Sequence, residues 1–312
     1  MLHIAMKNLG VNMFHFFPKR LKTALRNKWL FFVRQDLILD RLTKLEESVE
    51  NYRVHEIAQY LIKSHWAVLD RLHLLAEKDR ILCYLCGHED DKSAFKCYSS
   101  TCIFLGGELI RRQCPCCDVI FGPAKVLEME EEMLEFDYRL HYQLYSEGDS
   151  TDRILRSFEL LGLKKEGVYL DYGCGVAKPK ALLTLRSQGY QIYGFEPSLV
   201  NSSDWVFATT EELSRYRFNG IITHNVLEHL TDPIGVTSML KELLLPDGKL
   251  VHATPCYDYL YEYTRFHVFF FMGRSLEFLA ASAGMKLCEF IQSDDSDYMA
   301  AVLTPLGGMT DA

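Results

Sequence analysis

The stretch from Val168 to Arg186 constrains the fold more than any other part of the chain. It begins with a short apolar run, residues 168–170, which predicts a buried strand of a parallel sheet. Two glycines, Gly173 and Gly175, follow in a turn, and residues 180–186 then have the pattern of a helix. A strand, a glycine turn and a helix in this order predict the opening of a nucleotide-binding βαβ unit, where backbone amides come close to a ligand.

Two acidic residues accompany this turn. Glu196 follows the next predicted strand, residues 191–195, and lies 196 − 175 = 21 residues beyond the second glycine. An acid at this distance can accept hydrogen bonds from the hydroxyls of a ribose. Asp171 stands two residues before the first glycine, and Lys178 occupies the position of the third glycine in the dinucleotide-binding pattern. The glycines alone are also compatible with a tight turn in another kind of α/β domain.

An acid followed by G-x-G, with a second acid after the next strand, resembles the first motifs of the class I S-adenosylmethionine-dependent methyltransferases. Two later blocks are similar to that family. Residues 220–233 end in V-L-E-H-L-T-D-P, and residues 245–250 resemble the family's turn into the fifth strand. The resemblance covers residues 151–304. It implies a Rossmann-like α/β fold with a seven-stranded sheet, closed by an antiparallel pair at residues 285–292 and 298–304.

The resemblance also implies S-adenosyl-L-methionine as the cofactor. Gly173 and Gly175 would bring backbone next to its methionine part, and Asp171 would hold the turn and face the sulfonium. Glu196 would bind the ribose hydroxyls, and the end of the fourth strand would line the same pocket. Asp171 and Glu196 are also compatible with roles as a turn cap and a surface acid. The expected cofactor-binding residues are Asp171, Gly173, Gly175, Glu196, His224 and Asn225.

A methyl acceptor must lose a proton, and histidine is the natural base near neutral pH. His229 belongs to the L-E-H block, and His267 precedes three phenylalanines, at a place where the resembled family often has a histidine near the substrate. We expect both as catalytic residues, although each could instead be a packed structural histidine. Glu228 is expected to orient a neighbour rather than to act as the base.

The cysteines are clustered. Seven of the ten lie within residues 83–117, and four of them form two C-x-x-C pairs, Cys83 with Cys86 and Cys114 with Cys117. Such pairs predict a structural zinc ion held by four thiolates, with no open position for catalysis, in a protein of a reducing compartment. The stretch also looks like the zinc ribbon that precedes one branch of these methyltransferases. It departs from that pattern at Asp118, where glycine usually stands.

The N-terminal part leaves two pairs of alternatives open. Residues 1–34 carry basic and aromatic residues and no acid, which fits either peripheral contact with an anionic membrane or an amphipathic helix packed on its own subunit. Residues 36–78 read as a long helix, which could self-associate or pack on the enzyme. Its apolar seam has heptad spacing and consists of Ile38, Leu42, Leu45, Val49 and Tyr52.

The sequence therefore predicts four parts: an N-terminal helical region (1–80), a zinc ribbon (81–124), a linker or lid helix (125–150) and the methyltransferase domain (151–312). In the third part Tyr138, Tyr142 and Tyr145 share one helix face. They predict either a lid over the cofactor or an aromatic stripe packed on the core.

The formal net charge of −8 argues against a general nucleic-acid-binding surface, and no apolar run reaches the roughly 20 residues of a membrane span. We expect a cytoplasmic enzyme, peripheral to the inner face of the membrane if residues 1–34 bind lipid. Its acceptor is expected to be a small molecule or glycan, and the resemblance points to a sugar in surface-polysaccharide biosynthesis. The alternatives are an RNA or protein methyltransferase that grips its target with the ribbon, and a non-catalytic donor-binding scaffold.

Overall fold

The computed structural model describes residues 19–76, 78–146, 148–293 and 298–306, except for the side chains of residues 19–39 and 143. The chain divides into two units, residues 1–58 and 59–312. The prediction of membrane contact concerns residues 1–34, whose side chains lie outside the described part. None of the described helices combines the length and the apolar character needed to cross a membrane.

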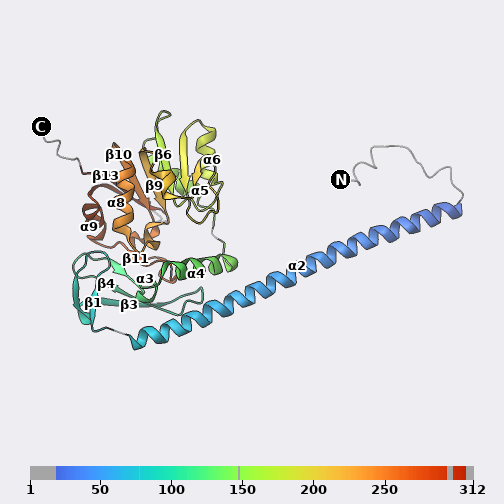
Figure 1. The fold of residues 1–312 in the computed structure, drawn as a ribbon, viewed down its shortest axis with the longest axis horizontal. Coiled ribbons are helices and arrows are strands. Elements are labelled where there is room, and N and C mark those ends of the chain that lie inside the picture. The colour runs from blue at the N-terminus through green and yellow to red at the C-terminus, as the bar shows by residue number, and fades with distance from the viewer. Residues whose placement is uncertain (1–18, 77, 147, 294–297, 307–312) are drawn as a thin grey trace. The chain divides into compact units, whose positions relative to one another are not determined.

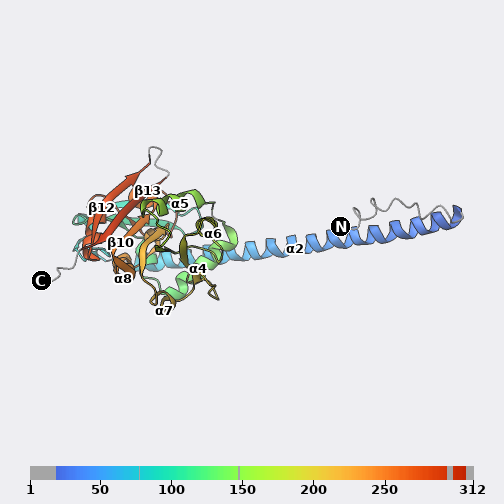
Figure 2. The same ribbon diagram turned by 90° about the horizontal axis from the view of Figure 1, so that it is seen from above.

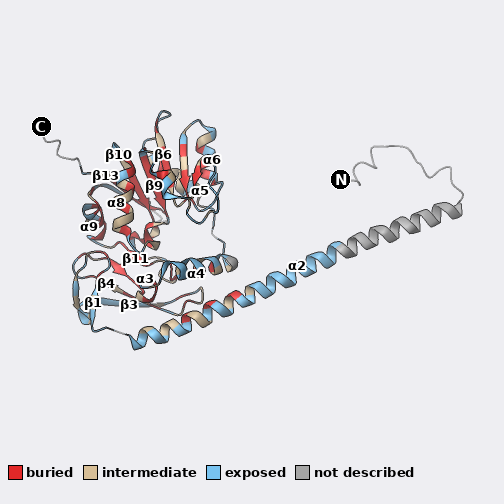
Figure 3. Cartoon of the chain, viewed as in Figure 1, coloured by how far each residue is buried: buried red, intermediate tan, exposed pale blue. Residues whose placement is uncertain are grey.

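One long helix, α2 (Lys19–Leu75), runs from the first unit into the second. It contains neither glycine nor proline, which explains why it begins well before the predicted residue 36. Residues 40–57 are exposed except at His55, and this exposed part includes the apolar seam from Leu42 to Tyr52 (Figure 3). Within the second unit, by contrast, Ile62 and Trp66 of the same helix are buried.

The second unit contains a seven-stranded sheet with the order β12-β13-β10-β9-β6-β7-β8 (Figures 1 and 2). Strands β6 to β10 pair in parallel, and β13 runs antiparallel to both of its neighbours. This order confirms the predicted fold class, and it puts the switch point, where ligands bind in open α/β sheets, at β6 and β9. The strands are β6 (Val168–Tyr172), β7 (Gln191–Phe195), β8 (Val206–Phe207), β9 (Phe218–His224), β10 (Leu244–Ala253), β12 (Met285–Gln292) and β13 (Met299–Pro305).

Helices cover both faces of this sheet, because neighbouring residues of a strand point to opposite sides. Ile222 and Val251 belong to a core with α5 and α6, whereas Ile221 and Leu250 belong to a core with α7, α8 and α9. Burial on both faces explains why the central strands read as continuous apolar runs. The helices are α5 (Thr151–Leu160), α6 (Lys180–Ser187), α7 (Thr210–Leu213), α8 (Pro233–Leu243) and α9 (Ser275–Ser282).

The cysteine-containing region forms a hairpin and most of a four-stranded sheet of order β11-β5-β4-β3. Its edge strand β11 comes from the C-terminal half, where Phe269 and Phe270 pair with Phe121 and Ile120. The region from residue 81 to 124 therefore shares a sheet with β11, which follows the last parallel strand, β10, in the sequence. The elements are β1 (Arg80–Leu82), β2 (Glu89–Asp91), η1 (Lys92–Ala94), β3 (Lys96–Thr101), β4 (Glu108–Gln113), β5 (Ile120–Phe121) and β11 (Phe269–Phe270).

The predicted linker or lid helix lies in the sequence between β5 and β6, and it is divided into α3 (Ala124–Leu127) and α4 (Glu131–Leu144). A buried ion pair anchors α4. Asp137 accepts hydrogen bonds from Arg265 at 2.6 Å and 3.0 Å and from the indole of Trp66 at 3.1 Å. Arg265 is fully buried and Asp137 nearly so, so the pair ties α4 both to the C-terminal half and to the end of α2.

Candidate functional site

The glycine turn lies where the sequence predicts it, directly after β6. Gly173 and Gly175 have positive φ angles of 82° and 76°. The amides of Gly173 and Cys174 both donate to the backbone oxygen of Phe195, at 2.9 and 3.0 Å. A Cβ atom on Gly173 would lie 2.5 Å from Cγ2 of Val226, so this position excludes any side chain on grounds of space as well as φ.

Glu196 contacts this turn. Its Oε2 accepts a hydrogen bond from the amide of Gly175 at 2.8 Å, and its Oε1 accepts from the amide and hydroxyl of Ser198. Carboxylate oxygens have several acceptor sites, so the same group can also accept from ribose hydroxyls. The second-strand acid and the glycine turn thus form one hydrogen-bonded edge of the site.

Asp171 is 1% exposed, and its Oδ2 has no hydrogen-bond partner among the described residues. Burial, and to a lesser degree the charge of Glu196, raises the pKa of Asp171 to about 7. A cationic ligand next to this oxygen would satisfy it and favour its ionised form. The chemistry of this side chain therefore fits the cationic donor that the sequence predicts.

The end of β9 contributes two further expected residues. Burial lowers the pKa of His224 to about 4, with a further lowering by Arg153, and neither ring nitrogen has a hydrogen-bond partner among the described residues. Asn225 follows with a φ angle of 54°, and its amide donates to the backbone oxygen of Ala253. His224 is neutral at physiological pH and can line a pocket without repelling a cation.

His229 has a defined hydrogen-bond environment in η2 (Leu227–His229). Its Nδ1 lies 2.9 Å from the backbone oxygen of Phe266 and 3.0 Å from the hydroxyl of Tyr138. A carbonyl oxygen only accepts, so Nδ1 carries the proton and Nε2 keeps its lone pair in the neutral ring. The side chain is 27% exposed, and Nε2 lies 4.0 Å from Oε1 of Glu228.

His267 lies beside it, with 5.0 Å between the two ring centroids. Its Nδ1 is 3.4 Å from Sγ of the buried Cys256 in η3 (Pro255–Tyr257). Burial, then the neighbouring His229, and then Arg111 hold the pKa of His267 well below its usual range. The two histidines expected as bases are thus neighbours in different surroundings, and Cys256 and Arg111 are contacts that sequence reasoning did not find.

The tyrosine face of α4 packs on the core through one of its three tyrosines. Tyr138 stacks on Phe266 with ring centroids 4.2 Å apart and also reaches His229. Tyr142 and Tyr145, in contrast, are 51% and 41% exposed. Tyr138 is therefore both a packed residue and a neighbour of the expected base, and nothing in the spacing of the tyrosines distinguishes it from the other two.

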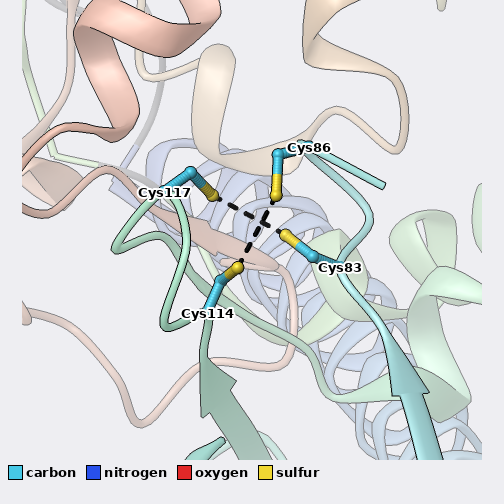
Figure 4. A group of neighbouring side chains, drawn as sticks. All are labelled: Cys83, Cys86, Cys114 and Cys117. Atoms are coloured by element: carbon cyan, nitrogen blue, oxygen red, sulfur yellow. Dashed lines mark hydrogen bonds between the residues drawn. The ribbon is translucent and has the colours of Figure 1, made fainter. Parts of the chain in front are cut away.

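The four predicted metal ligands come together (Figure 4). Their sulfur atoms all lie within 4.8 Å of one another, with 3.7 Å between Cys83 and Cys117 and 3.6 Å between Cys86 and Cys114. Four sulfurs at about 2.3 Å from a tetrahedral zinc ion would lie about 3.8 Å apart, so the cluster has the size of a zinc site.

Asp118 replaces the glycine of the second knuckle and still adopts its conformation, with a φ of 67°. Its amide donates to the backbone oxygen of Cys114, and its carboxylate accepts from the side chain and amide of Arg274. The side chain of Arg274 is the first cause that lowers the pKa of Asp118. The departure from the expected pattern thus leaves the knuckle closed and adds a contact to the residue that precedes α9.

A surface cavity of about 660 Å³ lies beside the first turns of α5 and α6, and none of the expected cofactor-binding residues lines it. Lys180, which looks out of place beside a cationic donor in the sequence, pairs there with Asp149 at 2.6 Å. The cavity is lined by Asp149, Thr151, Asp152, Lys180, Leu183 and Thr184.

Residues 141–290 match the family model described as "Methyltransferase domain". No curated protein matches the chain. Similar solved structures include a 1,6-didemethyltoxoflavin-N1-methyltransferase from Burkholderia thailandensis, with 16% identity, 62% of this chain and 94% of that chain covered, and a TM-score of 0.40. For the CcbJ methyltransferase from Streptomyces caelestis the values are 15%, 51%, 93% and 0.36. For an S-adenosylmethionine-dependent methyltransferase from Clostridium acetobutylicum they are 9%, 56%, 98% and 0.38. At such identities and scores these likenesses say nothing about the acceptor.

Proposed function

We propose that this chain, an S-adenosylmethionine-dependent methyltransferase, methylates a small-molecule or glycan acceptor with His229 as the base. The observation that carries the proposal is the pair of contacts at Nδ1 of His229. The contact with the backbone oxygen of Phe266 puts the proton on that nitrogen and leaves Nε2 able to accept one, and the hydroxyl of Tyr138 lies 3.0 Å from the same nitrogen. His229 follows β9, the strand next to β6 at the switch point of the sheet. A base at this position lies on the side of the sheet where the donor is expected.

The donor-binding part of the proposal rests on six residues around the turn. S-adenosyl-L-methionine supplies an electrophilic methyl group when it is bound. The residues of this chain have to hold it, orient it and exclude water. The orphaned Oδ2 of Asp171 supports a role next to positive charge, and Glu196 supports a role at ribose hydroxyls. Gly173, Gly175, His224 and Asn225 complete the proposed set.

His229 is preferred to His267 as the base. His229 has a side chain that is partly exposed, while the Nδ1 of His267 contacts a buried thiol. The low pKa of His267 also makes it a weak proton acceptor. Tyr138 would hold the His229 ring in its orientation, and burial raises the pKa of Tyr138 well above its usual value, so that its hydroxyl stays protonated.

A sugar in surface-polysaccharide biosynthesis is the acceptor that we propose, and the main support for it is the family resemblance. The tyrosine-rich stretch before His267 offers limited support for a sugar-binding face. Tyr261 is 45% exposed, but Tyr257 is buried and its hydroxyl donates to the backbone oxygen of His252. Of the residues in this stretch, Tyr261 is therefore the best candidate for stacking on an acceptor.

We further propose that Cys83, Cys86, Cys114 and Cys117 hold a structural zinc ion. Burial of three of the four sulfurs and the tetrahedral spacing support this role. For residues 1–34 and 36–78 we retain membrane contact and self-association as proposals, with a cytoplasmic location. Sedimentation with anionic vesicles in low and high salt tests the first, and sedimentation equilibrium of a Leu45→Lys variant tests the second.

The decisive experiment for the base compares His229→Asn with the wild type. The asparagine amide can still donate to Phe266, but no nitrogen remains at the Nε2 position. We expect methyl transfer from labelled S-adenosylmethionine to a panel of nucleotide-linked sugars to fall by about 10²- to 10⁴-fold, with unchanged donor affinity. His267→Asn serves as the comparison. A variant at His229 that turns over at the wild-type rate would overturn the assignment.

A further inference from the structure

We propose that Glu228, Cys256 and His267 form a second metal site, distinct from the four-cysteine cluster, and that it binds zinc. A carboxylate oxygen, a thiol sulfur and an imidazole nitrogen from these residues all lie within 4.8 Å of one another. Glu228 lies 28 residues before Cys256, and His267 lies 11 residues after it, so the chain has to fold to bring the three side chains together. Glu228 and Cys256 are fully buried, and His267 is partly buried.

The spacing suits a tetrahedral ion. Zinc binds sulfur at about 2.3 Å and nitrogen or oxygen at about 2.0 Å, which puts such ligand atoms about 3.3 to 3.5 Å apart. The distance from Sγ of Cys256 to Nδ1 of His267 is 3.4 Å, which already has this value. An oxygen of the Glu228 carboxylate lies within 4.8 Å of the other two ligand atoms, and rotation of its side chain can bring it closer to the ion.

Main-chain hydrogen bonds hold the three ligand segments together. The amide of Val268, next to His267, donates to the backbone oxygen of Glu228 at 2.9 Å. The amide of Phe271 donates to the backbone oxygen of Cys256 at 2.7 Å. Because the segments are joined at their backbones, the ligand set exists before any ion arrives, which is what a site of fixed geometry needs.

One further contact resembles the outer shell of a metal site. Thr254 supports the thiol segment, since its hydroxyl accepts from the amide of Cys256 at 3.1 Å. The buried Arg111 lies near the group, but its guanidinium donates to the backbone oxygens of Glu262, Thr264 and His267.

The donor set selects the metal. One carboxylate, one thiolate and one imidazole form a borderline set that suits zinc and does not suit magnesium or calcium, which prefer oxygen ligands alone. Binding replaces the thiol proton of Cys256 with a sulfur–zinc bond and releases that proton to solvent. Three protein ligands leave the fourth tetrahedral position open, as in catalytic zinc sites. The ring centroid of His229 lies 5.0 Å from that of His267.

The test uses the full chain, purified without chelators from cells grown with zinc. We expect about two zinc ions per chain by elemental analysis, and about one in Cys256→Ala and in His267→Gln. The matched control is Cys288→Ser, which changes an exposed cysteine and should keep both ions. Circular dichroism shows whether each variant is folded. Binding of S-adenosylhomocysteine shows separately whether the donor site is intact.

X-ray absorption at the zinc edge of the wild type needs no variant. Two sites predict a mixed shell, with nitrogen and oxygen next to sulfur. A single zinc ion with a pure four-sulfur shell would overturn the proposal, whatever the variants do. Zinc content that stays at one in the wild type and in both variants would lead to the same conclusion, and the group would then be a packed polar core.

Discussion

The amide of Gly175 donates a 2.8 Å hydrogen bond to Oε2 of Glu196, so the glycine turn and the acid after the second strand belong to one hydrogen-bonded unit. Each of the two residues is a weak signal alone. Their contact is what the order of β6 and β7 in the sheet produces, because parallel neighbours end at the same edge.

Removing this carboxylate should weaken donor binding. A charge-assisted hydrogen bond contributes about 1.5 to 3 kcal/mol, so Glu196→Ala should lower the affinity for S-adenosylhomocysteine about 10- to 100-fold in calorimetry. Glu211→Ala removes an exposed acid from α7 and is the matched control. If both variants bind the ligand as tightly as the wild type, Glu196 does not contact it.

Gly175 and Gly189 have similar φ angles, so a comparison of the two separates the effect of backbone strain on stability from an effect on donor binding. Gly175 has a φ of 76° and Gly189 a φ of 88°, and an added Cβ meets no atom within 4 Å at either position. Alanine should therefore cost a similar 1 to 2 kcal/mol or so of stability at both positions. Only Gly175→Ala should also lose donor affinity, because Gly189 lies outside the turn. An equal loss of affinity in both variants would mean that global strain, and not the site, is measured.

Donor binding should depend on pH through Asp171. Burial raises its pKa to about 7 from an ordinary value of 3.8, so the folded chain holds a proton that the unfolded chain releases between these values. The contribution of Asp171 to the stability of the ligand-free protein, taken as the difference between the wild type and Asp171→Asn, should thus fall as the pH rises from about 4 to about 7 and then level off. The cationic donor favours the ionised carboxylate, so its affinity should rise over the same upper range.

Denaturation and calorimetry at several pH values check both trends. Asp171→Asn should remove this contribution from each measurement, because the amide is neutral throughout and has nearly the same shape. A wild-type protein whose donor affinity is constant from about pH 6 to about pH 8 would contradict a position of Asp171 next to positive charge.

The cysteine cluster should stabilise the fold only through its metal. Cys114→Ser should lose the bound ion and lower the melting temperature, because Cys114 is fully buried and its sulfur is one of four in the cluster. Cys116 lies two residues away and is exposed, so the Cys116→Ser variant should keep the metal ion and the melting temperature of the wild type. Elemental analysis and thermal unfolding distinguish the two, and equal behaviour would exclude a metal at the predicted ligands.

The parallel sheet and its two helix layers could be predicted because local patterns fix them. Apolar runs such as residues 168–170 predict strands that are buried on both faces, and the helix predicted at residues 180–186 is α6, which ends one residue later. In the closing antiparallel pair the first strand has its predicted bounds, and the second begins and ends one residue later than predicted.

Contacts between distant segments could not be read in the same way. The tautomer of His229 depends on Phe266 and Tyr138, and the conformation of Asp118 is accompanied by a contact with Arg274. The spacing of these residues carries no signal, since each contact depends on how α4 and the segment before α9 pack. The sequence therefore predicts which residues belong to a site better than it predicts which nitrogen or oxygen atom of each residue is available to a ligand.

The pairing of Phe269 with Phe121 has a consequence for biosynthesis. The ribosome must add 269 − 121 = 148 residues after Phe121 of β5 before it reaches Phe269 of β11. Until then the cysteine-bearing segment has an open backbone edge, and other chains can pair with such an edge. Completion of this sheet therefore waits for the synthesis of residues 269 and 270, and products truncated before them would keep the edge of β5 open.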